Sequence, residues 1–304
     1  MSQAGAQPGR AQETRGLLLG ALGVAIFALT LPMTRLAVGT PEAPQLAGLF
    51  VGMGRAAVAG LLSLAWLLAL RAPLPARSDW WPLAMNALGV VFGFPLFMSV
   101  AMRYVGAVHA SVILGVLPLA TAAVGAFLHR QRPSNAFWAC AALGSGLVIG
   151  FALLRSGADG LALHPADLLL LAAMLCAAFG YGWGGRLAQH MSAEAVICWS
   201  LVLSLPATLP AAWWLRPHGA IAPAAWGGFV YVALFSMWIG FFAWYRGLAL
   251  GGTVRVSQML LLQPFLSMLF AVPLLGERID AVSLGFALAV LATVVLGRKL
   301  PVTQ

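Results

Sequence analysis

Two stretches of the sequence share one pattern: Ser111-Val-Ile-Leu-Gly-Val-Leu-Pro118 and Ser257-Gln-Met-Leu-Leu-Leu-Gln-Pro264. Both read Ser-x-x-Leu-x-x-x-Pro, and they lie 146 residues apart. The same offset pairs Arg132 with Arg278, just after each stretch. Because each stretch lies inside a long apolar run, we expect the chain to contain two copies of one helical unit.

The composition places these runs in a membrane. Of 304 residues, 62% are apolar and 8% are charged, whereas a soluble domain carries about 25% charged residues. This balance excludes an ordinary soluble protein and a disordered one. The runs are continuous rather than alternating, which favours helices over a membrane barrel. The net charge of +9 comes from Arg residues scattered between the runs, so we expect contact with a lipid bilayer and not with nucleic acid.

Ten runs have about the length that crosses a bilayer, which is near 20 residues. Pro, Gly or charged residues separate them, as in Gly39-Thr40-Pro41-Glu42. The expected spans cover residues 16–38, 46–70, 80–104, 107–129, 135–154, 165–189, 193–215, 224–247, 253–276 and 282–298.

The charges between the spans predict the orientation. With a cytoplasmic N-terminus, eleven Arg and Lys residues face inward and five face outward, as the positive-inside rule requires. We therefore expect both termini in the cytoplasm of a bacterial cell, with the chain in its inner membrane. The expected parts are a tail (1–15), a first five-helix repeat (16–154) and a second one (164–298).

Five spans per repeat is an odd number, so the second copy enters the membrane from the opposite side. The predicted fold is an all-α polytopic membrane protein with ten transmembrane helices in two inverted five-helix repeats. Inverted repeats are typical of secondary transporters, whose binding site lies between the halves near the bilayer midplane. The chain is therefore expected to bind a small-molecule substrate and to work by alternating access.

Local motifs carry a resemblance to a known family. The end of the ninth span reads Gln263-Pro264-Phe265 and then Leu274-Leu275-Gly276-Glu277. A mid-helix Pro and a closing Gly-Glu resemble the EamA type of the drug/metabolite transporter superfamily, over about residues 16–298. The first repeat differs from this family pattern, because Arg130-Gln131 occupies the position where Gly-Glu would end the corresponding span. The resemblance implies export of amino acids or related metabolites, as by the YddG-type amino-acid exporters.

Arg55 is a charge near the middle of the second span, where the family often carries Arg. A charge there costs about 2.5–3.5 kcal/mol on insertion scales, and none of the eight acidic residues lies deep in a span. Arg55 could attract a substrate carboxylate. It could instead be structural, bonding carbonyl groups of a neighbouring helix or extending its long side chain to the interface.

Polar and aromatic side chains at mid-span depth are the other candidate substrate-binding residues. Gln263 leads them, although its amide could instead satisfy backbone groups that Pro264 frees. Trp183 and Trp238 could stack on substrate or pack against helices and lipid. Pro118 and Pro264 are the expected hinges. The full candidate set is Arg55, Asn86, Ser99, Ser111, Tyr181, Trp183, Ser236, Trp238, Tyr245, Ser257, Gln258 and Gln263.

Other chemistries find little support in the sequence. The three Cys residues lie in apolar runs without metal-ligand spacing, and Gly144-Ser145-Gly146 lacks the nucleophile-elbow pattern. We expect no enzyme, no metal and no cofactor. All five His residues lie near span ends, which favours facilitated diffusion over strong proton coupling. If transport is coupled to protons, His109 is the candidate proton site.

Two rival functions remain from the sequence. One is an efflux carrier for drugs, nucleosides or lipid carriers, and the other is a structural membrane protein without transport. Drug-cation export favours a buried carboxylate, which the spans lack. The repeat and the mid-span prolines favour a transporter over a structural role. We expect a monomer or a weak homodimer.

Overall fold

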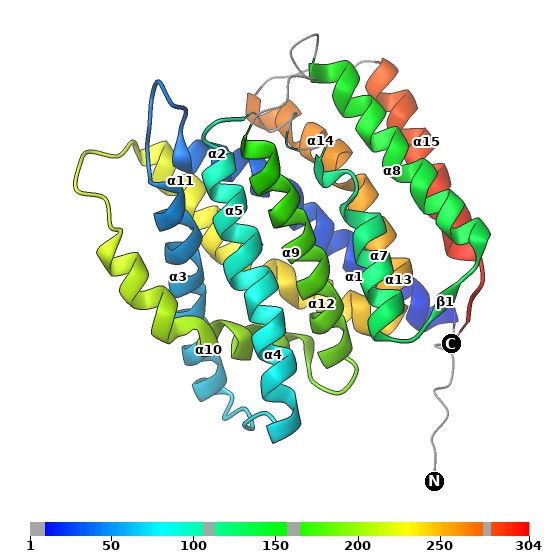
Figure 1. Cartoon of the computed structure of the whole chain (residues 1–304), viewed down its shortest axis with the longest axis horizontal. Coiled ribbons are helices and arrows are strands. Elements are labelled where there is room, and N and C mark those ends of the chain that lie inside the picture. The colour runs from blue at the N-terminus through cyan, green and yellow to red at the C-terminus, as the bar shows by residue number, and fades with distance from the viewer. Residues whose placement is uncertain (1–9, 106–109, 111–112, 157–164, 276–280, 304) are drawn as a thin grey trace.

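The computed structural model describes residues 10–105, 110, 113–156, 165–275 and 281–303. These residues are predominantly helical, as the sequence predicts (Figure 1). The first half of the chain forms α1 (Arg10–Ala28), α2 (Thr30–Val38), α3 (Gly48–Ala69), the 3-10 turn η1 (Arg77–Asp79), α4 (Trp80–Asn86), the π-helical η2 (Ala87–Gly93), α5 (Phe94–Ala101), α7 (Leu117–Leu128), the short strand β1 (Arg132–Pro133) and α8 (Asn135–Ser156).

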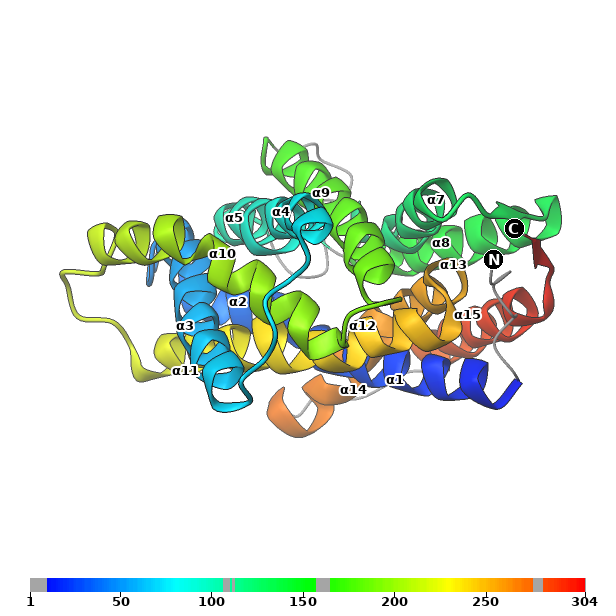
Figure 2. The same ribbon diagram turned by 90° about the horizontal axis from the view of Figure 1, so that it is seen from below.

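The second half has a similar order of elements. It forms α9 (Ala166–Leu187), α10 (Ala193–Trp214), α11 (Pro223–Tyr231), the π-helical η4 (Val232–Ile239), α12 (Gly240–Gly251), α13 (Thr253–Val256), the 3-10 segment η5 (Ser257–Leu262), α14 (Gln263–Leu275), α15 (Ala281–Lys299) and the strand β2 (Val302–Thr303). β2 pairs antiparallel with β1. Figures 1 and 2 both show α8 and α15 side by side at one edge of the molecule.

Membrane-spanning capacity differs between the helices. Six helical segments of the described chain are long and apolar enough to cross a bilayer: Ala11–Val38, Gly48–Ala69, Arg77–Ala101, Ala166–Leu187, Ala193–Trp214 and Pro223–Gly251. Three more apolar helices are shorter, Leu117–Leu128, Asn135–Phe151 and Leu284–Gly297. The run expected as one span over 253–276 is divided into α13, η5 and α14. Because Pro264 has no amide hydrogen, it cannot complete an α-helical bond there.

A second proline divides the first predicted span into α1 and α2. Pro32 cannot donate to the carbonyl of Ala28, four residues earlier. The hydroxyl of Ser267, on α14, donates to that Ala28 carbonyl instead. The amide of Gln263 donates to the Phe27 carbonyl at 3.3 Å. The break in the first helix is therefore bonded to the beginning of α14, which lies 236 residues further along the chain.

Glycines bring α1 and α12 into direct backbone contact. A Cβ atom added to Gly16 would lie 2.3 Å from the backbone nitrogen of Gly251. One added to Gly247 would lie 2.7 Å from the backbone nitrogen of Gly20. Small residues spaced four apart allow this approach in membrane proteins, where close packing rather than water exclusion holds helices together.

The two π-helical segments occupy matching places in the two halves of the chain. η2 and η4 begin 145 residues apart and end 146 residues apart, which agrees with the offset of the sequence pattern. Pro95 follows η2, but Phe241 stands at the equivalent position after η4. The π-helical turn therefore forms in the second half without a proline to force it.

Two arginines tie the ends of α2 and α5 together. Arg35 donates to the carbonyl of Met102 and, at 2.7 Å, to that of Arg103. Arg103 donates in return to the carbonyls of Val38 at 3.2 Å and Leu46 at 2.6 Å. Arg35 thus satisfies carbonyl groups just after α5, where they have no partner within the helix. Arg103 binds the last carbonyl of α2 and the Leu46 carbonyl in the connection to α3.

Candidate functional site

A cavity lies where the break between α1 and α2 meets α3, α9, η4, α12 and the start of α14. It is narrow in this conformation, because the centre of a water-sized molecule can occupy about 20 Å³ of it. We call it the Arg55 cavity. Its lining residues are Phe27, Thr30, Leu31, Arg55, Val90, Phe94, Met98, Leu114, Leu117, Tyr181, Ser236, Phe241 and Gln263.

Among the described residues of that lining, only Arg55 has a charged side chain. The side chain is 1% exposed, so it does not extend to the membrane surface. Its Nη2 donates to the hydroxyl of Ser236 at 3.1 Å. Its Nε and Nη1 are buried and bond to none of the described residues. A buried cation with unused donors is costly unless an anion or another acceptor reaches it.

A hydroxyl pair continues from the guanidinium to the helix break. Ser236 lies 2.8 Å from the hydroxyl of Thr30, which is the first residue of α2. The sequence reasoning did not single out Thr30. Pro32 was the available signal, because a mid-span proline predicts a helix break and exposes the polar residues beside it.

Aromatic rings form the apolar wall of the cavity. The rings of Phe27 and Tyr181 are stacked, with centroids 6.5 Å apart and planes within 7°. Phe241 contacts both, at 5.2 Å from Phe27 and 6.0 Å from Tyr181. The cavity therefore combines one cationic group with an aromatic surface. Phe27 and Phe241 are further lining residues that the sequence could not distinguish from other apolar residues in the spans.

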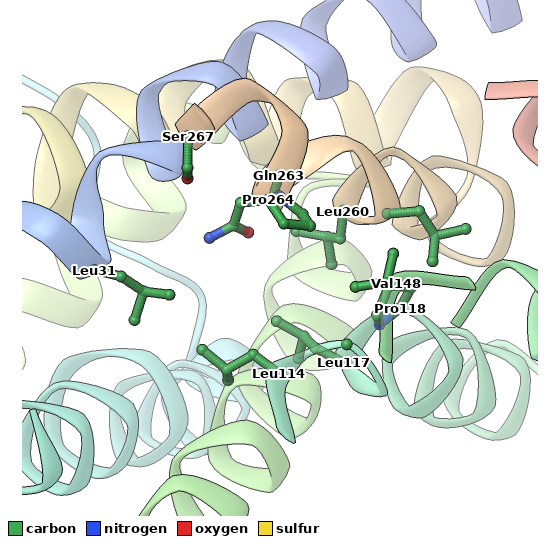
Figure 3. A pocket seen from close by; sticks show the side chains of 11 residues that line it. Leu31, Leu114, Leu117, Pro118, Val148, Leu260, Gln263, Pro264 and Ser267 are labelled. Carbon is green, nitrogen blue, oxygen red and sulfur yellow. The ribbon is translucent and has the colours of Figure 1, made fainter. Parts of the chain in front are cut away.

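A second cavity joins the first. Leu31, Leu114, Leu117 and Gln263 line both cavities. The prolines at the ends of the two repeated sequence patterns, Pro118 and Pro264, also line this second cavity, as does Ser267 (Figure 3). Figure 3 shows the Gln263 amide in the opening between Leu31 and Pro264. The two expected hinges thus meet at one cavity.

Four of the residues expected to bind substrate line the Arg55 cavity: Arg55, Tyr181, Ser236 and Gln263. Asn86 and Tyr245 lie elsewhere and bond to each other, because the Tyr245 hydroxyl donates to the Asn86 side-chain oxygen at 2.6 Å. The Asn86 amide nitrogen in turn donates to Ser200 at 2.8 Å. All three are fully buried, so this network joins α4, α10 and α12.

Other expected residues also have contacts away from the two cavities. The Trp238 indole donates to the sulfur of Cys198 at 3.5 Å. The Arg186 guanidinium lies over the ring of Trp183, 5.5 Å from its centroid. The hydroxyl of Ser257, at the start of η5, donates to the Val254 carbonyl of the preceding α13 at 2.8 Å. Trp238, Trp183 and Ser257 line neither of the two cavities.

Ser99 and Gln258 are buried and also line neither of the two cavities. Ser111 and His109 lie outside the described residues. Within the part of the chain that the structure describes, no three His, Cys, Asp or Glu side chains come close enough to hold a metal ion.

The apolar helices define a multi-pass membrane protein. The model of the EamA-like transporter family matches residues 14–154 and again residues 164–297, and the chain belongs to this family. The family is a family of transporters and not a class of enzymes.

Similar proteins cover almost the whole chain. It is 41% identical over 290 residues to the uncharacterized transporter YdeK of Bacillus subtilis (strain 168), covering 95% of this chain and 98% of YdeK. It is 24% identical over 291 residues to the inner membrane protein YtfF of Escherichia coli (strain K12), covering 87% of this chain and 91% of YtfF. A solved crystal structure with 19% identity, covering 93% of this chain and 96% of the other, has the same fold with a TM-score of 0.69.

Proposed function

We propose that this chain is a secondary transporter that exports small metabolites across the bacterial inner membrane, amino acids with aromatic or other apolar side chains first among them. The observation that carries the proposal is the buried Arg55 guanidinium, whose Nε and Nη1 have no partner among the described residues. A substrate carboxylate offers two acceptor oxygens, which suit the fork of N–H groups on Arg.

The neighbours of Arg55 support an apolar substrate. Tyr181, Phe27 and Phe241 line the same cavity, and aromatic rings favour contact with an aromatic or aliphatic side chain. A charged group and an apolar wall in one cavity would bind the two ends of an apolar amino acid. A structural membrane protein would have no use for a buried cation that leaves donors unpaired.

The proposed architecture is ten transmembrane helices in two inverted five-helix repeats that alternate access to the cavity. Three observations support it: the tandem family matches, the matching places of η2 and η4, and the meeting of Pro118 and Pro264 at one cavity. Bent helices at such a point supply the hinges that a rocking motion needs. We propose cytoplasmic termini, and a monomer or weak homodimer in the bilayer.

The decisive experiment is uptake of labelled amino acids into liposomes that contain the purified chain, with and without a pH gradient. We expect saturable uptake of aromatic or aliphatic amino acids that the gradient leaves unchanged. Gradient-dependent uptake would keep the transporter and point to a proton site such as His109. No uptake by a folded protein would contradict the amino-acid proposal and favour another cargo, such as drugs, nucleosides or lipid carriers.

The topology has a separate test. Reporter fusions in loops 39–45 and 71–79 are expected to report opposite sides of the membrane. The same side for both would contradict the ten-span arrangement.

A further inference from the structure

We infer that the Arg55 cavity recognises the carboxylate of its substrate and not the amino group, so that apolar monocarboxylates without an amino group are also substrates. This inference rests on the proposed function and narrows it, because it states which end of the substrate is bound by charge. It follows from the charges of the lining residues and from the hydrogen bonds they already make.

Among the described residues that line the Arg55 cavity, none has an acidic side chain. Three carboxylates on the described helices pair with bases elsewhere: Glu13 with Arg255, Asp79 with His190 and Glu194 with Arg246. The undescribed residues that shortly precede Leu114 in the sequence, 106–109 and 111–112, include no Asp or Glu. An ammonium group in this cavity would therefore have no carboxylate partner among the residues known to surround it.

The neutral polar groups of the lining are also largely engaged. The hydroxyls of Ser236 and Thr30 bond to each other, and Ser236 also accepts from Arg55. The amide nitrogen of Gln263 donates to the Phe27 carbonyl. The side-chain oxygen of Gln263 remains as a neutral acceptor for an ammonium group, whereas Arg55 offers two unused donor atoms for a carboxylate.

The balance of charge favours the same conclusion. A bound monocarboxylate neutralises Arg55 and brings no second charge into the cavity. An amino acid also neutralises Arg55, but it brings an ammonium group that loses its water without gaining a carboxylate partner. Removing a charged group from water without a partner costs several kcal/mol. The amino group gains only neutral acceptors here, so we expect that removing it does not weaken binding.

The test compares three ligands that differ only in their charged groups: phenylalanine, hydrocinnamate (phenylalanine without the amino group) and phenethylamine (phenylalanine without the carboxylate). Isothermal titration of the purified full-length chain in detergent measures the Kd of each. We expect hydrocinnamate to bind at least as tightly as phenylalanine, and phenethylamine not to bind. Uptake of labelled phenylalanine into liposomes is measured in parallel, because it tests the proposed function on its own.

Variants assign the effect to Arg55. Arg55→Met is expected to weaken hydrocinnamate binding by about 10- to 100-fold, because a hydrogen-bonded charge is lost. Arg246→Met removes an arginine that is 55% exposed at the end of another helix, and the Kd should not change. If Arg55→Met does not fold, Arg55→Lys replaces it, because this change keeps the charge but removes the fork of donors that suits a carboxylate. The three-ligand comparison on the unaltered chain tests the inference without any variant.

Each outcome has one meaning. Binding of phenylalanine with hydrocinnamate about tenfold weaker or worse would show that the amino group is recognised, which overturns the inference and leaves the proposed transporter intact. Binding of phenethylamine as tight as that of phenylalanine would also overturn it, since the carboxylate would then be dispensable. If neither phenylalanine nor hydrocinnamate binds, and no phenylalanine is taken up into liposomes, both the inference and the amino-acid proposal are contradicted.

Discussion

The Tyr245 hydroxyl donates a 2.6 Å hydrogen bond to the side-chain oxygen of Asn86, and both residues are fully buried. Asn86 belongs to α4 and Tyr245 to α12, so the bond joins helices from the two halves of the chain. The sequence presents both residues as candidates for substrate binding. Their mutual bond instead indicates a structural role, because their polar groups are already satisfied.

Tyr245→Phe is expected to lower the free energy of unfolding by about 1–3 kcal/mol, since the buried Asn86 oxygen loses its donor. Thermal unfolding in detergent measures the change. The double variant with Asn86→Leu should lose less than the sum of the two single changes, because both break the same bond. Full additivity, or no loss for Tyr245→Phe, would contradict the structural role.

Gly16→Ala is expected to lower the unfolding temperature, because its Cβ would lie 2.3 Å from the backbone of Gly251. Overpacking of this kind costs about 1–3 kcal/mol. Gly285→Ala is the matched control, since a Cβ there meets nothing within 4 Å. That change should be neutral or stabilise α15 by about 0.5–1 kcal/mol. Equal effects of the two changes would refute the backbone contact.

Gln263→Ala is expected to reduce transport by about 2- to 10-fold without loss of folded protein, which corresponds to one uncharged hydrogen bond. The residue lines both cavities and bonds to the Phe27 carbonyl. Gln258→Ala provides the control and should leave transport unchanged. Gln258 is a buried glutamine five residues before Gln263, but it lines neither cavity. Uptake in liposomes and gel filtration measure both properties. Unchanged transport would remove Gln263 from the site.

Glu13 and Arg255 join the start of α1 to α13 through a 3.2 Å ion pair. Reversing either charge alone should destabilise the protein by up to about 1 kcal/mol, and reversing both should restore most of the loss. High salt should reduce the difference between the single variants and the original chain. Thermal unfolding at low and high salt provides the measurement. No recovery in the double reversal would show that the pair does not contribute.

The sequence predicts the helices well because hydropathy, proline and charge are local signals. It predicts the division of the first span only in outline: Pro32 indicates a bend, but the bond from Ser267 to Ala28 requires the folded chain. The position of the cavity is harder to predict. Helices that are apolar on all faces carry no pattern that distinguishes the side facing the cavity from the side facing lipid.

The candidate site illustrates the same limit. Ser236 and Tyr245 are polar residues nine positions apart in one helical segment, yet only Ser236 lines the Arg55 cavity. Arg55 itself was recognisable from its charge at mid-span. Thr30, which bonds to the Ser236 hydroxyl, was indicated only indirectly by the neighbouring Pro32, because a threonine in an apolar run is ordinary. Packing between distant segments decides which polar residues satisfy one another and which remain available.

The π-helical segments η2 and η4 determine the angular phase of the helices that follow them. An α-helix turns by about 100° per residue, and a π-helical turn accommodates one residue more than an α-helical turn. Deleting one residue from Val232–Ile239 would let this segment close as a regular α-helix and would leave α12 and Phe241 in nearly the same phase. The same deletion in the α-helical Pro223–Tyr231 would rotate the helix that follows by about 100° relative to what precedes it and take Phe241 out of the cavity wall. Correct function of this segment therefore depends on its phase as much as on its length, so a deletion in η4 and a deletion in α11 should have very different consequences.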